Sequence, residues 1–288
     1  MPLPSHQLDA FWAVAETQSF SRAAERLHVT QPALSQRIQH LEAELERKLF
    51  VRGPGGVKLT EAGARLLRYC QTQRALEAEL VSDLAADAGP GLGGVVRIAG
   101  FSSVMRSCVV PALAETFRQN PRLSVELFVR ELEEVHETFA RGGADFALLD
   151  APIERPDIEH EVVGHEELVM IESTKHRSRD DVFLDHDPRD TTTLTFLKRA
   201  GKKGPQHVER SFFDDIYGIL DGVANGYGRA VVSRHLLRDH DDLRIVQSFK
   251  PVRSPVVLSW FRQPAYTRAH ETVRKALATG TARVLVTR

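Results

Sequence analysis

The pattern of apolar residues changes at residues 87–94, DAGPGLGG, and this change constrains the fold more than any other feature. Before it, apolar side chains recur at spacings of three and four, which is typical of amphipathic helices. After it, strand-like runs such as VVRIAGF alternate with helix-like runs such as VMRSCVVPALAETFRQNP, and further helices are expected over about 209–225 and 266–279. Alternation of this kind builds a mostly parallel sheet with helices on its faces. We therefore predict a helical N-terminal domain, a hinge and an α/β C-terminal domain.

The first 60 residues contain the pattern of a helix-turn-helix. Residues 6–17 place apolar side chains on one helical face, and Ser19 or Ser21 can cap the next helix, SRAAERLHV. Thr30 can cap a third helix, in which Pro32 takes the first turn, where a missing N–H costs nothing. Two short helices separated by a turn of about three residues are typical of DNA-binding domains.

A short hairpin and a long helix follow. The runs FV and VKL on either side of GPGG predict a hairpin, or wing, that carries Arg52 and Lys58. From Thr60 to about Ala86 the pattern predicts a linker helix with an apolar stripe. Such a stripe needs a partner, either its own domain or a second copy of the chain, and we expect the second copy. The candidate dimerisation residues are Leu76, Leu80 and Leu84.

The net charge of −1 conceals an asymmetry between the two ends of the chain. Residues 1–75 carry +3 and the remaining residues −4, which fits a domain that binds a polyanion joined to another domain. A hydrophobic share of 42% and a charged share of 27% are those of a globular protein. No apolar run is long enough to span a membrane, and the start MPLPSHQLDAF lacks the features of a signal peptide. We therefore expect a cytoplasmic protein without a membrane partner.

The sequence lacks the motifs of common catalytic and metal sites. Cys70 and Cys108 do not have CxxC spacing, so neither a disulfide framework nor a zinc site is indicated. The acidic and histidine-containing runs at 165–167 and 239–242 lack HExxH spacing, and neither a glycine-rich phosphate loop nor GxSxG occurs. We therefore predict no enzyme activity, no metal and no cofactor.

The segment SFSRAAERLHVTQPALSQRIQHLEAELERKLFVRGPGGVKLTEAG resembles the N-terminal region of LysR-type transcriptional regulators. The resemblance rests on the AA pair, the TQPALS helix, the LE pair, the LF–RG wing and the TEAG start of the linker helix. VRIAG, VPALAETFRQNP, ADFALL and GVANGYGRAVVS extend it over nearly the whole chain. It implies a C-terminal domain like a periplasmic binding protein, with two α/β subdomains and a small-molecule cleft between them. It also implies homodimers or homotetramers and a contact with RNA polymerase.

These patterns together set the expected domain boundaries. We expect a winged helix-turn-helix over 1–60, a linker and dimerisation helix over 61–88, and a hinge over 89–94. The effector-binding domain then covers 95–288. Within it, 95–165 with 266–288 form the first subdomain, and 166–265 form the second.

Base contacts are expected at the start of the third helix. Base edges in the major groove are read by short side chains that both donate and accept hydrogen bonds, and Gln31, Ser35 and Gln36 have this capacity. Pro32 and Ala33 can lie against thymine methyl groups. The resemblance implies that the family's DNA contacts fall on Gln31, Pro32, Ser35, Gln36 and Arg52. Gln36 stands where many members have arginine, which leaves its base preference open.

Phosphate and minor-groove contacts are expected nearby. Arg22, Thr30 and Arg37 can hold phosphates, with the N-terminus of the third helix as a further anion site. Arg52 on the wing is placed to enter a minor groove. The expected partner is therefore double-stranded promoter DNA with a partly palindromic site.

Candidate effector-binding residues follow strands of the C-terminal domain. Ser102 and Ser103 open the helix after VVRIAG, where hydroxyls and free N–H groups bind a carboxylate readily, although plain capping is the alternative. Arg130 and Asp150 end the strands SVELFVR and ADFALLD and are further candidates. Gly226 in ANGYG provides a backbone turn near the cleft in this fold, or merely permits a positive φ.

The loop DHDPRDTTT, residues 185–193, resembles the lysine- and arginine-responsive members of the family. In these members a DH–D stretch precedes a phenylalanine–leucine pair, here Phe196 and Leu197. Asp185 and Asp190 would then receive a cation, and the effector would be a basic amino acid. The alternative is an ordinary solvated loop.

The favoured function is a ligand-responsive, sequence-specific transcription factor. One alternative is a nucleoid-type protein that binds DNA without sequence preference. Another is a cytoplasmic solute-binding protein or enzyme whose N-terminal helices serve only assembly. The missing signal peptide argues against a solute carrier.

Overall fold

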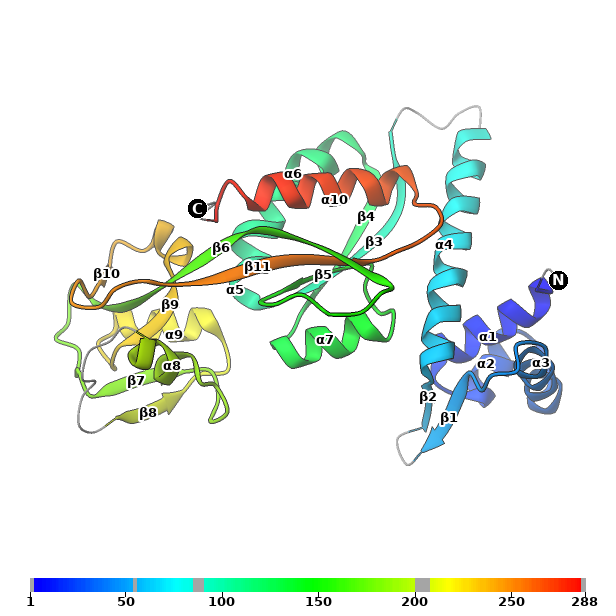
Figure 1. Cartoon of the computed structure of the whole chain (residues 1–288), viewed down its shortest axis with the longest axis horizontal. Coiled ribbons are helices and arrows are strands. Elements are labelled where there is room, and N and C mark those ends of the chain that lie inside the picture. The colour runs from blue at the N-terminus through cyan, green and yellow to red at the C-terminus, as the bar shows by residue number, and fades with distance from the viewer. Residues whose placement is uncertain (1–2, 54–55, 85–90, 200–207, 286–288) are drawn as a thin grey trace.

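The computed structural model describes residues 3–53, 56–84, 91–199 and 208–285. Along the chain it contains a small helical domain with a hairpin, one long helix, and an elongated α/β domain (Figure 1). The long helix α4 (Glu61–Leu84) stands between the other two parts. None of the described helices is both long and apolar enough to cross a membrane.

Three helices form the N-terminal domain: α1 (Ser5–Thr17), α2 (Phe20–Arg26) and α3 (Gln31–Glu44). Ser19 caps α2 by accepting a hydrogen bond from the N–H of Arg22, and Thr30 caps α3 by accepting one from the N–H of Ala33. Small side chains where the helices meet permit close packing. The buried core includes Phe11, Ala23, Ala24, Leu34, Ile38 and Leu41.

The wing follows as an antiparallel hairpin of β1 (Phe50–Gly53) and β2 (Gly56–Leu59). Glu42, 9% exposed, joins α3 to this hairpin. Its carboxylate accepts hydrogen bonds from Lys48 Nζ at 2.7 Å and from the N–H of Leu49 at 2.8 Å and of Phe50 at 3.5 Å. Burial alone would raise the pKa of Glu42, but these hydrogen bonds together hold its pKa below the usual value.

Replacing Glu42 by glutamine is expected to destabilise the N-terminal domain by about 1–3 kcal/mol at neutral pH, because a charge-assisted acceptor is lost. A lowered folded-state pKa stabilises the fold above the ordinary glutamate pKa of 4.5, and this contribution is lost as pH falls. The difference between wild type and variant should therefore shrink below about pH 4.5 in urea unfolding. Glu44→Gln, on the exposed side of α3, is the control. A difference of the same size at pH 3 and pH 7 would contradict this account.

The first part of the C-terminal domain has the predicted alternation of strands and helices. Its parallel strands are β3 (Gly93–Gly100), β4 (Arg122–Val129) and β5 (Phe146–Leu149). One composite helix follows β3, made of α5 (Ser102–Val104), the π-helix η1 (Met105–Val109) and α6 (Val110–Gln119). Helices α7 (Leu132–Ala140) and α10 (Arg268–Thr281) complete this part.

Two long antiparallel strands, β6 (Ile158–Ser173) and β11 (Val252–Phe261), connect the first part to the second (Figure 1). The main sheet has the order β10-β6-β11-β5-β3-β4, and β9 also pairs with β6. The remaining elements are β7 (Val182–Asp185), α8 (Thr192–Arg199), β8 (Glu209–Phe212), α9 (Ile216–Ala224), β9 (Ala230–Ser233), the 3₁₀-helix η2 (Arg234–Asp239) and β10 (Leu243–Ile245).

Two predictions for the second part were wrong. The helix expected over 209–225 begins only at Ile216, because residues 209–212 form β8, which pairs in parallel with β7. The boundary between the two subdomains, expected at residue 265, also lies elsewhere. Residues 257–260 of β11 pair with β5, so β11 belongs to the first subdomain from Val257 onward.

Candidate functional site

The outward face of α3 presents the side chains expected to read bases. Gln31, Pro32 and Gln36 are exposed, and Ala33 and Ser35 are half-buried, while the opposite face fills the domain core. In the part of the chain that the structure describes, the three polar side chains form no hydrogen bond to other protein groups. Their donors and acceptors are therefore available to a partner.

The residues expected to contact phosphates or a minor groove belong to α2, to α3 with its cap, and to β1. Arg22 is exposed, and its guanidinium donates to the carbonyl of Thr17. Thr30 is exposed as well as capping α3, and Arg37 is half-buried. The backbone of Arg52 lies in β1, but its side chain is outside the described part of the structure. The N-terminus of α3, which Thr30 caps, carries a partial positive charge that favours anions there.

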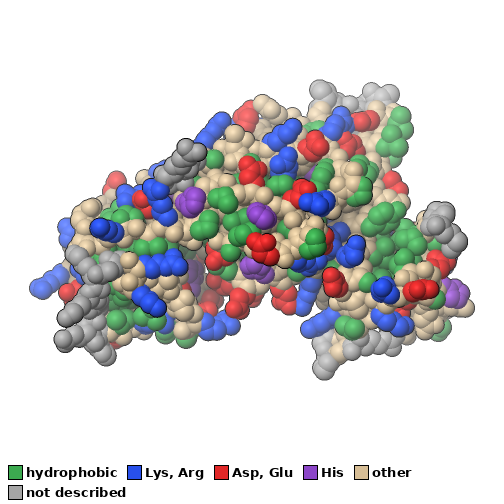
Figure 2. All heavy atoms as spheres, viewed as in Figure 1, with side chains coloured by type: hydrophobic (Ala, Val, Ile, Leu, Met, Phe, Trp, Pro, Cys, Tyr) green, Lys and Arg blue, Asp and Glu red, His purple; other side chains and the backbone are tan. Residues whose placement is uncertain are grey.

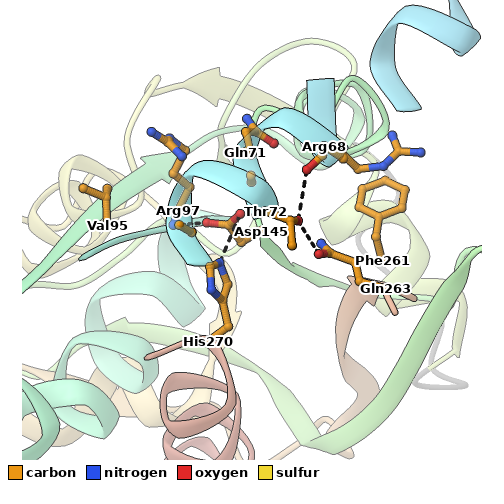
Figure 3. A pocket seen from close by; sticks show the side chains of 11 residues that line it. Arg68, Gln71, Thr72, Val95, Arg97, Asp145, Phe261, Gln263 and His270 are labelled. Atoms are coloured by element: carbon orange, nitrogen blue, oxygen red, sulfur yellow. Dashed lines mark hydrogen bonds and ion pairs between the residues drawn. The ribbon is translucent and has the colours of Figure 1, made fainter. Parts of the chain in front are cut away.

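The linker helix α4 docks on the first subdomain of its own chain (Figure 3). Gln71 Nε2 donates to the carbonyl of Gly142 at 3.0 Å, and the hydroxyl of Thr72 donates to Gln263 Oε1. Farther along α4, Arg268 of α10 pairs with Glu79 and Asp83. The docked face of α4 is thus polar.

Arg68 is a largely buried part of this contact, with a side chain only 11% exposed. Its guanidinium carbon lies 3.8 Å from the centroid of the Phe261 ring, and Nη2 is 3.4 Å from Asp157 Oδ2 (Figure 3 shows the ring contact). Burial lowers the pKa of Arg68 to about 10, and Asp157 opposes that shift. A desolvated cation stacked on an aromatic ring fixes the position of α4 on the effector domain.

The apolar stripe of α4 begins next to the docked face at Leu76 and turns away from it toward Leu84. Leu76, Leu80 and Leu84 are 37%, 59% and 75% exposed in the single chain. Figure 2 shows hydrophobic side chains gathered along α4 on the side away from the effector domain. Among the described residues, Leu80 and Leu84 are therefore mostly uncovered by their own chain, and Leu76 is partly covered. Residues 85–88 of the predicted linker helix and 89–90 of the predicted hinge lie outside the described residues.

Three predicted effector residues meet at one edge of the main sheet. Arg130 directly follows β4, and Asp150 directly follows β5. Ser102 follows β3 after one intervening residue. These strands are parallel neighbours in the order β5-β3-β4, so their carboxyl ends lie together with Ser102 between the other two. The carboxyl edge of a parallel sheet is where α/β proteins bind ligands.

The three side chains are accessible to different degrees. Ser102 is half-buried at the start of the composite helix, and Arg130 and Asp150 are exposed. Arg130 is anchored by its backbone N–H, which donates to the carbonyl of Gly100 at 3.1 Å. Within the described residues, neither Ser102 nor Asp150 forms a side-chain hydrogen bond. A hydroxyl, a guanidinium and a carboxylate can together bind a small zwitterion.

Ser103 has a different environment from Ser102. Its hydroxyl donates to Glu166 Oε1 at 2.8 Å, so this donor is already used within the protein. Gly226 lies two residues beyond the end of α9 with φ +81°, and an added Cβ would lie 2.6 Å from His176 Cβ. The positive φ and the lack of space for a Cβ are therefore sufficient to explain why residue 226 is a glycine, without a role in ligand binding.

The predicted cation site at Asp185 and Asp190 conflicts with the geometry. Asp185 is 2% exposed, and its oxygens accept from Thr193 Oγ1 and Arg210 Nε, both at 2.5 Å. Asp190 accepts from two backbone N–H groups of its own loop, at 3.2 Å and 2.8 Å. Both carboxylates thus stabilise the second subdomain. The sequence does not indicate Arg210 as a partner of Asp185, because residues 209–225 have the pattern of a helix and the contact depends on the pairing of β8 with β7.

Comparison with known families covers both parts of the chain. Residues 5–64 match "Bacterial regulatory helix-turn-helix protein, lysR family", and residues 89–282 match "LysR substrate binding domain". The chain belongs to the LysR family of transcriptional regulators. This LysR regulator is thus a DNA-binding protein with an effector-binding domain, and the family is one of regulators rather than enzymes.

Two curated relatives are named as transcriptional regulators. The LysR regulator is 39% identical over 173 residues to "HTH-type transcriptional regulator ShiR" of Corynebacterium glutamicum, a match over 59% of this chain and 58% of that protein. It is 31% identical over 264 residues to "Probable RuBisCO transcriptional regulator" of Porphyra purpurea, over 85% of this chain and 83% of that protein.

Solved structures share the fold over the whole chain. Full-length LysG of Corynebacterium glutamicum "with bound effector Arg" has a TM-score of 0.78 at 18% identity, covering 99% of this chain and 100% of that one. ArgP of Mycobacterium tuberculosis has a TM-score of 0.80 at 19% identity, covering 100% of both chains. At this identity the likeness concerns the fold.

Proposed function

We propose that this LysR regulator binds a partly palindromic promoter site as a homodimer or homotetramer and contacts RNA polymerase there. Gln31, Ser35 and Gln36 read bases, and the basic residues around α3 hold phosphates. The free polar face of α3 supports this assignment, since its donors and acceptors are not used by the protein. The exposed leucines of α4 support assembly through this helix.

The effector is a small carboxylate-bearing molecule, and an α-amino acid fits best. The observation that carries this proposal is the convergence of Ser102, Arg130 and Asp150 at one sheet edge. Ser102, the adjacent N–H groups and Arg130 would bind the carboxylate, and Asp150 would bind the ammonium group. The fold shared with LysG, whose structure is described as holding arginine, makes basic amino acids the first candidates.

Binding of this ligand changes DNA binding only if the ligand has different affinities for two conformations. The two subdomains are joined by β6 and β11, so a ligand held at the carboxyl edge of the first can change the angle between them. The docked α4 would transmit this change to the DNA-binding domain, because Arg68, Gln71 and Thr72 attach it to the first subdomain.

Calorimetric titration of the full chain with a panel of amino acids and organic acids tests the effector class. We expect heat from an α-amino acid, and Ser102→Ala should weaken its binding about 10- to 100-fold while DNA binding without ligand is retained. Ser124→Ala, an exposed serine near the other end of β4, is the matched control. Binding only by uncharged ligands, or equal affinity in wild type and Ser102→Ala, would refute the proposal.

A further inference from the structure

A buried polar cluster lies where the two subdomains meet. Glu166 of β6 is 7% exposed, and its Oε1 accepts hydrogen bonds from Ser103 Oγ at 2.8 Å and from Ser233 Oγ at 2.6 Å. His235 Nε2 lies 2.9 Å from the same oxygen, and His235 Nδ1 lies 2.9 Å from Ser107 Oγ. Ser103 and Ser107 belong to the composite helix of the first subdomain, whereas Ser233 and His235 belong to the second. The cluster therefore connects the two subdomains through side chains.

Glu166 lies at the point where β6 passes from one subdomain to the other. Residues 158–162 of β6 pair with residues 257–261 of β11, the part of β11 that also pairs with β5. Residues 168–171 of β6 pair with β9 in the second subdomain. Residue 166 lies between these two stretches. Bending of the connection there moves the serines of the composite helix relative to Glu166 and to η2.

Arg106 adds a third contact from the same helix. Its guanidinium carbon lies 3.9 Å from the centroid of the Tyr217 ring on α9, and such a contact between a cation and an aromatic face is attractive. Ser103, Arg106 and Ser107 follow one another at spacings of three and four, so they share one helical face. Three side chains of the composite helix thus meet three elements, β6, α9 and η2.

We propose that these contacts form a clamp that holds the two subdomains at one relative angle. A change of angle about β6 and β11 must separate Ser103 from Glu166 and Arg106 from Tyr217. A buried acceptor that loses its donor is costly, so the clamp favours the angle at which the contacts are made. The clamp consists of Ser103, Arg106 and Ser107 on the composite helix and of Glu166, Tyr217, Ser233 and His235 on the elements that it meets.

The clamp begins one residue after Ser102. In the proposed function Ser102 binds the effector, and the next residue, Ser103, donates to Glu166. A ligand held by Ser102 therefore acts on the same helix end that holds the second subdomain. The clamp goes beyond the proposed function and does not rest on it, because it fixes the angle between the subdomains whatever the ligand is.

Pulsed electron resonance between two spin labels on the full-length chain tests the clamp. Glu134→Cys on α7 and Thr195→Cys on α8 place one label at an exposed position of each subdomain. The native thiols of Cys70 and Cys108 are buried and should not take up label. Labelled chains are exchanged into an excess of unlabelled chains, so that each oligomer contains one labelled pair. We expect one narrow distribution of distances in the otherwise wild-type protein.

Two variants each remove one contact of the clamp. Ser103→Ala should raise the share of a second distance population about tenfold, because buried Glu166 loses a donor. Arg106→Gln should raise this share about threefold, since the contact with the ring is partly exposed. Ser124→Ala on β4 and Arg118→Gln on α6 change exposed residues of the first subdomain and are the matched controls.

The distances separate a clamp from a merely local role of these residues. A local role would lower the melting temperature of Ser103→Ala and leave its distribution of distances unchanged. The proposal is overturned by a broad wild-type distribution, or by the wild-type distribution in either variant. Arg106→Gln changes an exposed residue, so it keeps the test decisive if Ser103→Ala does not fold. The measurement needs neither ligand nor DNA, so its failure is distinct from failure of the proposed function.

Discussion

Replacing Leu80 by glutamate is expected to separate the protomers and to lower affinity for the full DNA site by about 10²–10⁴-fold. Leu80 lies at the centre of the exposed stripe, where a dimer partner would bury it, and a buried charge without a partner is costly. Without the dimer, two half-sites can no longer be bridged, and each domain binds alone. Light scattering gives the assembly state, and filter binding to a two-half-site duplex gives the affinity.

The control for this variant is Ala78→Glu, which adds the same charge at another exposed position of α4. At 100° per residue, position 78 lies about 160° from Leu80, away from the stripe. Ala78→Glu should keep both assembly and affinity. A Leu80→Glu protein that stays a dimer would show that the protomers meet elsewhere.

The second large effect is expected on α3. Gln31→Ala or Ser35→Ala should each cost about 1–3 kcal/mol at the specific site, a loss of about 5- to 150-fold in affinity. Binding to random DNA should change little, since phosphate contacts supply that affinity. Competition binding with specific and random duplexes measures both. Gln119→Ala, an exposed polar residue at the end of α6, is the control.

The comparison between the two duplexes decides how these residues act. Equal weakening on specific and random DNA would mean that Gln31 and Ser35 grip the backbone and do not read sequence. A regulator that reads bases must lose specificity when base-reading side chains are removed.

The N-terminal half was predictable because its signals are local. Ser19 and Thr30 cap α2 and α3 within three residues of their partners, and the wing is a hairpin whose strands are adjacent in sequence. The ends of β3, β4 and β5 were also visible as breaks in apolar runs. These breaks alone indicate Ser102, Arg130 and Asp150 as candidate ligand-binding residues.

The second subdomain was less predictable because its contacts are distant in sequence. β7 and β8 are four residues each and pair across more than 20 intervening residues, so periodicity does not reveal them. The partnership of Asp185 with Arg210 depends on that pairing. Glu166 and His235 are 69 positions apart, and no spacing in the sequence indicates their contact.

Selection of bound duplexes from a random DNA pool by the full-length protein tests the central claim most directly. We predict enrichment of one partly palindromic sequence, bound about 10³-fold or more tightly than a shuffled duplex at physiological salt. Affinity for both duplexes should fall as salt rises. A pool without enrichment, and equal affinities for selected and shuffled duplexes at every salt concentration, would contradict sequence-specific regulation and indicate nucleoid-type binding.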